Sequence, residues 1–186
     1  GWERVEFEVL LAEICVKLGR EEQGRSAYFR ALQHEPNHLA ALRGLGELER
    51  SLEHWGDAAK ILSRYAAVAP LEERAGIYEE VAAIYEERLN DQAGCIVALE
   101  RAGECVNAGV EVYRRLADQY LATHRSNDAA WALKKVIAQA SEPDEVSELY
   151  WDLAQVFGEQ LDDMPNALKC LNLALDAAPT NVKAFQ

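Results

Sequence analysis

Small residues that directly follow an aliphatic residue recur along the chain at nearly equal intervals of 34, 36, 35 and 37 residues. A large side chain stands four residues before most of them, and another stands three residues after most of them. Positions with this spacing share one face of a helix, so the pattern predicts five amphipathic helices. The five dipeptides are Leu11-Ala12, Leu45-Gly46, Val81-Ala82, Leu116-Ala117 and Leu153-Ala154.

A second helical pattern follows each of these helices and has a small residue, a large apolar residue four positions on, and usually another small residue. The sets are Gly24/Tyr28/Ala31, Ala58/Leu62/Ala66, Cys95/Leu99/Ala102, Ala129/Leu133/Val136 and Ala167/Leu171/Ala174. Gly19 between the first two helices suits a left-handed C-cap. Prolines close most units, at Pro36, Pro70, Pro143 and Pro179, and a proline cannot continue the helix before it. The sequence therefore predicts ten helices in antiparallel hairpins and no strand.

This repeating pattern resembles the tetratricopeptide repeat (TPR) family, whose helix-turn-helix unit has about 34 residues. The resemblance implies an all-α fold, a right-handed superhelical α-solenoid of about five repeats in a single array over residues 1–186. We expect units at about 5–38, 39–72, 75–109, 110–146 and 147–180, with 181–186 as the start of a truncated further unit. The alternative is another helical solenoid, such as a HEAT-like array.

The units depart from the family pattern at a few positions. Glu8 and Glu49 stand where an aromatic residue is usual, and units three to five contain insertions of one or two residues.

The charge of the chain narrows the choice of partners. The sequence has 32 acidic and 19 basic residues, a formal net charge of −13. A negative surface repels phosphate backbones and anionic lipid, so we expect no nucleic-acid partner and no membrane insertion. The four cysteines form no CxxC pair, which favours reduced thiols and a cytoplasmic location, with the periplasm as the alternative.

The segment His34-Glu35-Pro36-Asn37-His38 matches HExxH formally, but Pro36 breaks the continuous helix that this zinc motif needs. No nucleophile elbow or phosphate-binding glycine loop is present. We therefore expect a protein that is not an enzyme and that has no cofactor and no metal site.

In the resembled family, the first helix of each unit lines a concave groove that binds a peptide or a helix. The resemblance implies the following groove residues here: Glu13, Arg43, Glu47, Arg50, Glu79, Glu86, Arg114, Asp118, Trp151 and Gln155. This lining is mainly acidic, which favours a partner segment with Lys or Arg. Trp151 is either an aromatic anchor in the groove or part of the packing between helices.

Some TPR domains hold a C-terminal carboxylate with basic and amide side chains. The corresponding positions here carry Val9, Glu13 and Gly44, so a carboxylate would be repelled.

Two functions remain open from the sequence. The first is a non-enzymatic scaffold that binds a partner peptide or helix in its concave groove. The second is a regulatory or oligomerisation segment of a larger multidomain protein whose activity lies outside this fragment. Exposed ends of a repeat array would also allow self-association.

Overall fold

The computed structural model describes residues 2–180, with Trp2 described by its backbone only. The expected start of a further unit at 181–186 lies outside the described residues. The helices fall into two compact parts, Gly1–Asn107 and Ala108–Gln186, called here the N-terminal part and the C-terminal part. Each part is described by itself.

All regular elements in residues 2–180 are helical, as the sequence predicts. The N-terminal part contains α1 (Trp2–Lys17), α2 (Glu21–His34), α3 (Leu39–Ser51), α4 (Trp55–Val68), α5 (Leu71–Ala83), the π-helical segment η1 (Ile84–Arg88) and α6 (Gln92–Gly103). The C-terminal part contains α7 (Val110–Ala122), α8 (Ser126–Ile137), α9 (Pro143–Gln155), the π-helical segment η2 (Val156–Gln160) and α10 (Met164–Ala177).

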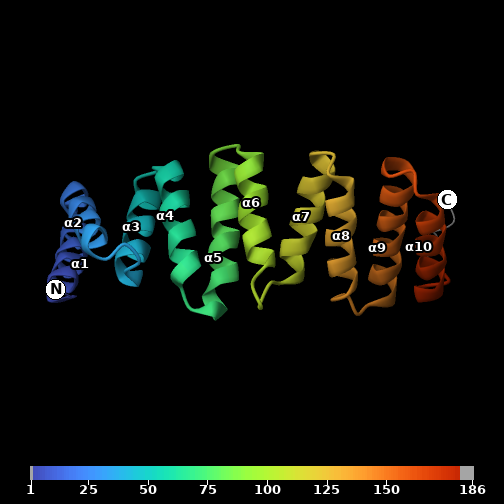
Figure 1. Ribbon diagram of the computed structural model, residues 1–186, viewed down its shortest axis with the longest axis horizontal. Coiled ribbons are helices and arrows are strands. Elements are labelled where there is room, and N and C mark those ends of the chain that lie inside the picture. The colour runs from blue at the N-terminus through green and yellow to red at the C-terminus, as the bar shows by residue number, and fades with distance from the viewer. Residues whose placement is uncertain (1, 181–186) are drawn as a thin grey trace. The chain divides into compact units, whose positions relative to one another are not determined.

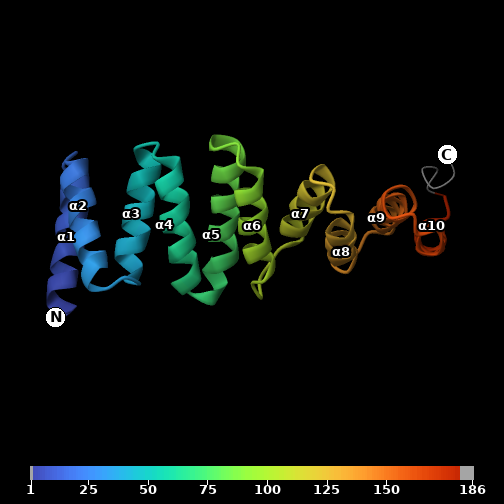
Figure 2. The same cartoon turned by 45° about the horizontal axis from the view of Figure 1, so that its top comes forward.

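Consecutive helices pack as antiparallel pairs, which Figures 1 and 2 show from two directions. The pairs are α1 with α2, α3 with α4, and α5 with α6 in the N-terminal part, and α7 with α8 and α9 with α10 in the C-terminal part. The five antiparallel pairs confirm the all-α class. Within the N-terminal part, α2 also packs on α3 and α4 on α5, so the three pairs share contacts. The unit boundaries and the single array stay a prediction.

The small residues of the repeat lie where the two helices of a pair approach closely. Ala12, Gly46, Ala82, Ala117 and Ala154 are all buried. A Cβ atom added to Gly46 would stand 2.6 Å from Leu62 Cδ2, and one added to Gly24 would stand 3.1 Å from the carbonyl oxygen of Ala12. Larger side chains would force the helices apart, because the protein interior leaves no spare volume.

In the turn inside every pair, one residue has a positive φ, in the left-handed region of backbone conformation. Gly19 has φ +70°, as its predicted C-cap role requires. The equivalent residues of the other four pairs are not glycine: Glu53 (φ 59°), Asn90 (φ 48°), His124 (φ 58°) and Asp162 (φ 51°). In the first pair, the amide of the next residue, Arg20, donates to the Cys15 carbonyl oxygen at 2.8 Å, which closes the helix end.

The third and fifth pairs accommodate one more residue before this turn. The small residue of the first helix and that of the second helix are separated by 13 positions in these pairs (Ala82 to Cys95, Ala154 to Ala167), against 12 in the other three. The closing hydrogen bond accordingly spans six residues instead of five, from the Asp91 amide to the Tyr85 carbonyl at 2.8 Å. A π-helical turn contains one residue more than an α-helical turn, so η1 and η2 absorb the insertion without a break in the helix.

The left-handed turns give a test by exchange of residue type. Replacing Glu53 with glycine removes the steric cost of φ 59°, and we expect unfolding free energy to rise by about 0.5–1 kcal/mol. The reverse substitution, Gly19→Ala, meets no atom within 4 Å, so its expected loss of about 1 kcal/mol comes from the backbone alone. Denaturant unfolding followed by circular dichroism measures both, and equal midpoints for all three proteins would contradict the assignment of strain to these turns.

Candidate functional site

The structure places the ten predicted groove residues in two sets, one in each part. The set in the N-terminal part lies on α1, α3 and the α5–η1 segment, and the set in the C-terminal part lies on α7 and α9. Seven of the ten side chains are exposed, whereas Glu79, Arg114 and Trp151 are half-buried. The assignment of these residues to a partner site stays a prediction.

The two arginines of the N-terminal set are already paired with carboxylates. Arg43 Nε lies 3.1 Å from Glu47 Oε1 one helical turn along α3, and this hydrogen bond raises the pKa of the Arg43 guanidinium. Arg50 on α3 lies 3.3 Å from Glu80 on α5, which links the first helices of two successive pairs. Among the described residues, Glu13 and Glu79 have no hydrogen-bond or ion-pair partner. Within this predicted groove set, the charges without a partner are therefore negative.

Tyr28 stands at the junction between the first helices α1 and α3. Tyr28 comes from α2, and its ring lies against Gly44 of α3 so closely that a Cβ atom there would overlap the ring. Burial raises the pKa of Tyr28, and the negative charges of Glu13 and Glu47 raise it further. One charge on α1 and one on α3 therefore act on the same hydroxyl group at the junction between these helices.

The next junction, between α3 and α5, repeats this arrangement with different charges. Tyr65 of α4 is buried, and its hydroxyl donates to Glu73 of α5 at 3.0 Å. Arg43 of α3 also acts on the Tyr65 hydroxyl, where its positive charge opposes the rise in pKa that burial and Glu73 cause. A second-helix tyrosine thus reaches between successive first helices at both junctions.

An ion pair links the two first helices of the C-terminal set. Arg114 on α7 pairs with Glu145 on α9, and both side chains are partly exposed. Trp151 on α9 is half-buried, which fits both an anchor in the groove and packing between helices, so the two interpretations stay open. Trp131 on α8 is 46% exposed and meets Tyr113 edge to face, with ring centroids 5.9 Å apart.

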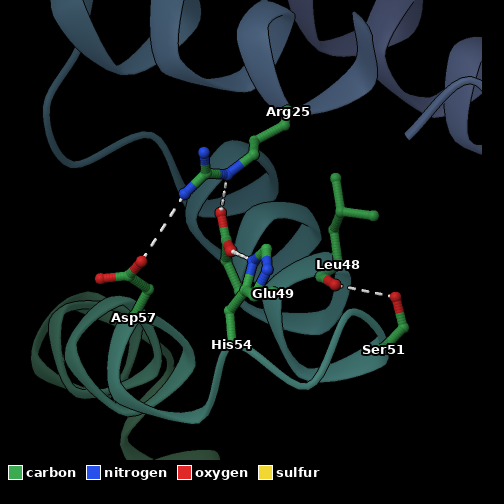
Figure 3. A network of polar contacts seen from close by, with 6 residues as sticks. All are labelled: Arg25, Leu48, Glu49, Ser51, His54 and Asp57. Carbon is green, nitrogen blue, oxygen red and sulfur yellow. Dashed lines mark hydrogen bonds and ion pairs between the residues drawn. The ribbon is translucent and has the colours of Figure 1, made fainter. Parts of the chain in front are cut away.

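The two glutamates at aromatic positions of the repeat are buried and paired. Glu49 is fully buried, and its carboxylate accepts from Arg25 Nε at 2.5 Å and lies 2.8 Å from His54 Nδ1. Figure 3 shows Arg25 of α2 between this carboxylate and Asp57 of α4. Arg25 Nη2 lies 3.6 Å from Asp57 Oδ2. A buried carboxylate is stable only with such partners, so this network joins α2, α3 and α4 structurally.

Glu8 is held in the same way. Arg30 of α2 donates two hydrogen bonds to its Oε2, at 2.9 and 3.0 Å. These bonds lower the pKa of the Glu8 carboxyl, although burial opposes the effect. Sequence reasoning missed Arg25 and Arg30; the signal was a glutamate at a core position of the repeat, which requires a cation nearby.

The HExxH segment has no metal-site geometry. α2 ends at His34, and His38 caps α3, where its Nδ1 accepts from the Ala41 amide at 3.3 Å and its Nε2 lies 3.1 Å from Glu6. The two imidazoles therefore do not share a helix. No group of three or more potential metal ligands occurs among residues that the structure describes. Within the same residues, no helix is long and apolar enough to cross a membrane.

Breaking the buried ion pair between Arg25 and Glu49 should lower the free energy of unfolding, and removing both charges should restore most of it. Arg25→Met leaves the Glu49 carboxylate buried with only His54 as a partner, and we expect the free energy of unfolding to fall by about 2–4 kcal/mol. Adding Glu49→Leu removes the stranded charge and should recover most of this loss. Arg43→Met, which breaks an exposed pair, serves as the control, with an expected change below about 1 kcal/mol. Denaturant midpoints measure all four proteins, and a double variant no more stable than Arg25→Met would refute the role of the buried charge.

Comparisons with known proteins concern the fold. No protein-family model and no curated protein sequence matches the chain. The BF2334 protein of Bacteroides fragilis NCTC 9343, a TPR repeats protein, is similar with a TM-score of 0.57 at 12% identity, covering 97% of this chain and 91% of its own. The MamA protein is similar with a TM-score of 0.51 at 19% identity, covering 100% of this chain and 98% of its own. Together with the five antiparallel helix pairs, these likenesses confirm that the chain has the tetratricopeptide repeat fold.

Proposed function

We propose that this chain is a non-enzymatic interaction module that binds a basic segment of a partner protein along its first helices. Stacked helical hairpins present extended binding surfaces, and rigid helices hold side chains at fixed positions on them. In the N-terminal part this surface consists of α1, α3 and α5.

One observation carries the proposal, namely that exposed carboxylates of two successive first helices, Glu13 and Glu47, both act electrostatically on Tyr28, whose ring lies against Gly44 of α3. Both carboxylates are exposed, and they come from successive first helices. A Lys or Arg side chain of a partner segment would face Glu13 and would share Glu47 with Arg43. The paired arginines Arg43 and Arg50 would hold neighbouring carboxylates in place, because each is tied to a glutamate of the same surface.

Charge reversal tests this site. The double variant Glu13→Lys, Glu47→Lys should weaken binding of a short fluorescein-labelled peptide of alternating Arg and Leu by about tenfold or more, since two attractions become repulsions. Fluorescence anisotropy at about 0.15 M ionic strength, where the screening length is about 8 Å, limits the contribution of remote charges.

The matched control is Glu35→Lys, Glu53→Lys, which makes the same change in net charge at two exposed turn residues. General attraction between a basic peptide and a chain of net charge −13 predicts equal losses for both double variants. Equal losses would therefore overturn the site, whereas a loss confined to the Glu13 and Glu47 variant supports it.

A second function, self-association or docking within a larger protein, is favoured by a separate surface. Phe7, Leu10 and Ile14 of α1, with Leu18 just after it, form an apolar stripe with 47% to 63% of each residue exposed. Their spacing puts them on one helix face, and exposed apolar surface of this kind is typical of interfaces.

Sedimentation velocity over a range of protein concentrations distinguishes this function. A mass that rises with concentration, and that Leu10→Glu with Ile14→Glu returns to the monomer value, is the expected result for a self-associating stripe. A constant monomer mass for the parent protein would refute self-association through α1.

A further inference from the structure

A hollow of about 720 Å³ lies between α4 and α6 in the N-terminal part, on a surface that the sequence did not single out. Tyr78 of α5 and Tyr85 of η1 lie among its lining residues, and Ala67, Val97 and Ala98 contribute its apolar surface. A smaller hollow of about 300 Å³ continues from it and shares Ala67, Tyr78 and Arg101. We call the two together the α4–α6 groove. Its volume is in the range of sites that bind ligands or peptide side chains.

The charge of this groove is opposite to that of the whole chain. Arg64 and Arg101 line the larger hollow, which has no carboxylate in its lining, and the smaller hollow adds Arg74 and Glu104. Three arginines against one glutamate make a basic surface on a chain of net charge −13.

The arginine charges of the groove are largely unneutralised. Arg64 donates to the carbonyl oxygen of Pro36 at 2.7 Å, and Arg74 to that of Ala69 at 2.8 Å. Among the described residues, neither guanidinium has a carboxylate partner. Arg101 does pair with Glu104 at 3.1 Å, but both side chains are at least 60% exposed, and such a pair is weak.

The arginines also lie close to the aromatic lining. Arg74 and Arg101 line the smaller hollow together with Tyr78, and their positive charges oppose the rise in pKa that burial causes at this tyrosine. Val97 is 56% exposed beside them. An apolar side chain could therefore lie against the tyrosines and Val97 while carboxylates on either side of it meet the arginines.

We infer that the α4–α6 groove binds an acidic peptide segment of another protein, with an aliphatic or aromatic side chain seated against Tyr78 and Tyr85. A second copy of this chain is a poor occupant, because two molecules of net charge −13 repel each other. A short acidic segment avoids most of this repulsion, since at physiological ionic strength charges beyond about 8 Å are screened while the arginines of the groove are in contact. This site is independent of the acidic surface on α1 and α3.

The probe is a short fluorescein-labelled peptide of Asp and Glu with a central Leu-Phe pair, measured by fluorescence anisotropy at about 0.15 M ionic strength. We expect saturable binding that falls by about tenfold or more in the double variant Arg64→Glu, Arg101→Glu. The matched control, Lys17→Glu with Lys60→Glu, makes the same change in net charge at exposed lysines outside the groove and should change affinity less than about twofold. A peptide with Ser-Ser in place of Leu-Phe should bind at least about tenfold more weakly, because it lacks the apolar anchor.

A variant that fills the groove tests the site without a change in charge, and circular dichroism checks that the variant still folds. Ala67 is exposed and lines both hollows, so Ala67→Trp should fill the groove and abolish binding while circular dichroism stays unchanged. Amide chemical-shift changes in the labelled protein should cluster at Tyr78, Val97 and Ala98.

Several outcomes would overturn the inference. They are the absence of saturable binding, equal affinity of the parent and the Arg64→Glu, Arg101→Glu variant, and shift changes on α1 and α3 instead of the groove. Self-association of the parent that the arginine reversals abolish would assign the groove to a second copy and overturn the choice of occupant. The variant Glu13→Lys, Glu47→Lys should still bind the acidic peptide even if it loses the basic peptide. The two proposed sites can therefore be refuted separately.

Discussion

The close approach of the two helices in each pair is the constraint on which the other features of this structure depend. Ala12 and Gly24, and likewise Gly46 beside Leu62, leave so little space that one added carbon atom would collide with the partner helix. Because the two helices of a pair lie this close together, long side chains of the second helix can reach the neighbouring pair. Tyr28 and Tyr65 do so: the Tyr28 ring lies against Gly44 of α3, and the Tyr65 hydroxyl donates to Glu73 of α5. The surface that the first helices present is thus a consequence of the packing beneath it.

The first two pairs bury charged residues where later units have aromatic rings. Where later units place Tyr78, Tyr85 or Tyr120, these pairs have Glu8 and Glu49, and each is satisfied by an arginine of α2. Burying a charge is costly unless its partner is present, whereas an aromatic ring is favoured by burial alone. The exchange therefore makes α2 the element that both α1 and α3 require, and it gives this region a specific geometry through directional hydrogen bonds.

Charge is segregated within the N-terminal part. The first helices carry carboxylates whose nearby arginines are already paired, and the α4–α6 groove carries arginines bonded mainly to backbone carbonyls. A net charge of −13 describes neither surface, because screening confines electrostatic recognition to about 8 Å. Under the two proposals above, these surfaces of opposite sign would hold two different segments.

The sequence by itself determined the helical class, the ten helices, their pairing and the burial of the small residues, because all of these follow from local periodicity. It also indicated the position of the π-helical turns, since the spacing from Ala82 to Cys95 exceeds by one residue the spacing in pairs without such a turn. Only the tertiary structure decided which charges are paired. Arg25 with Glu49, Arg50 with Glu80 and Arg114 with Glu145 are separated by 24, 30 and 31 residues, and no periodic signal connects them. The same is true of the α4–α6 groove: Tyr78 and Arg101 meet because long side chains reach across neighbouring helices, and the direction in which they extend depends on packing that no single segment encodes.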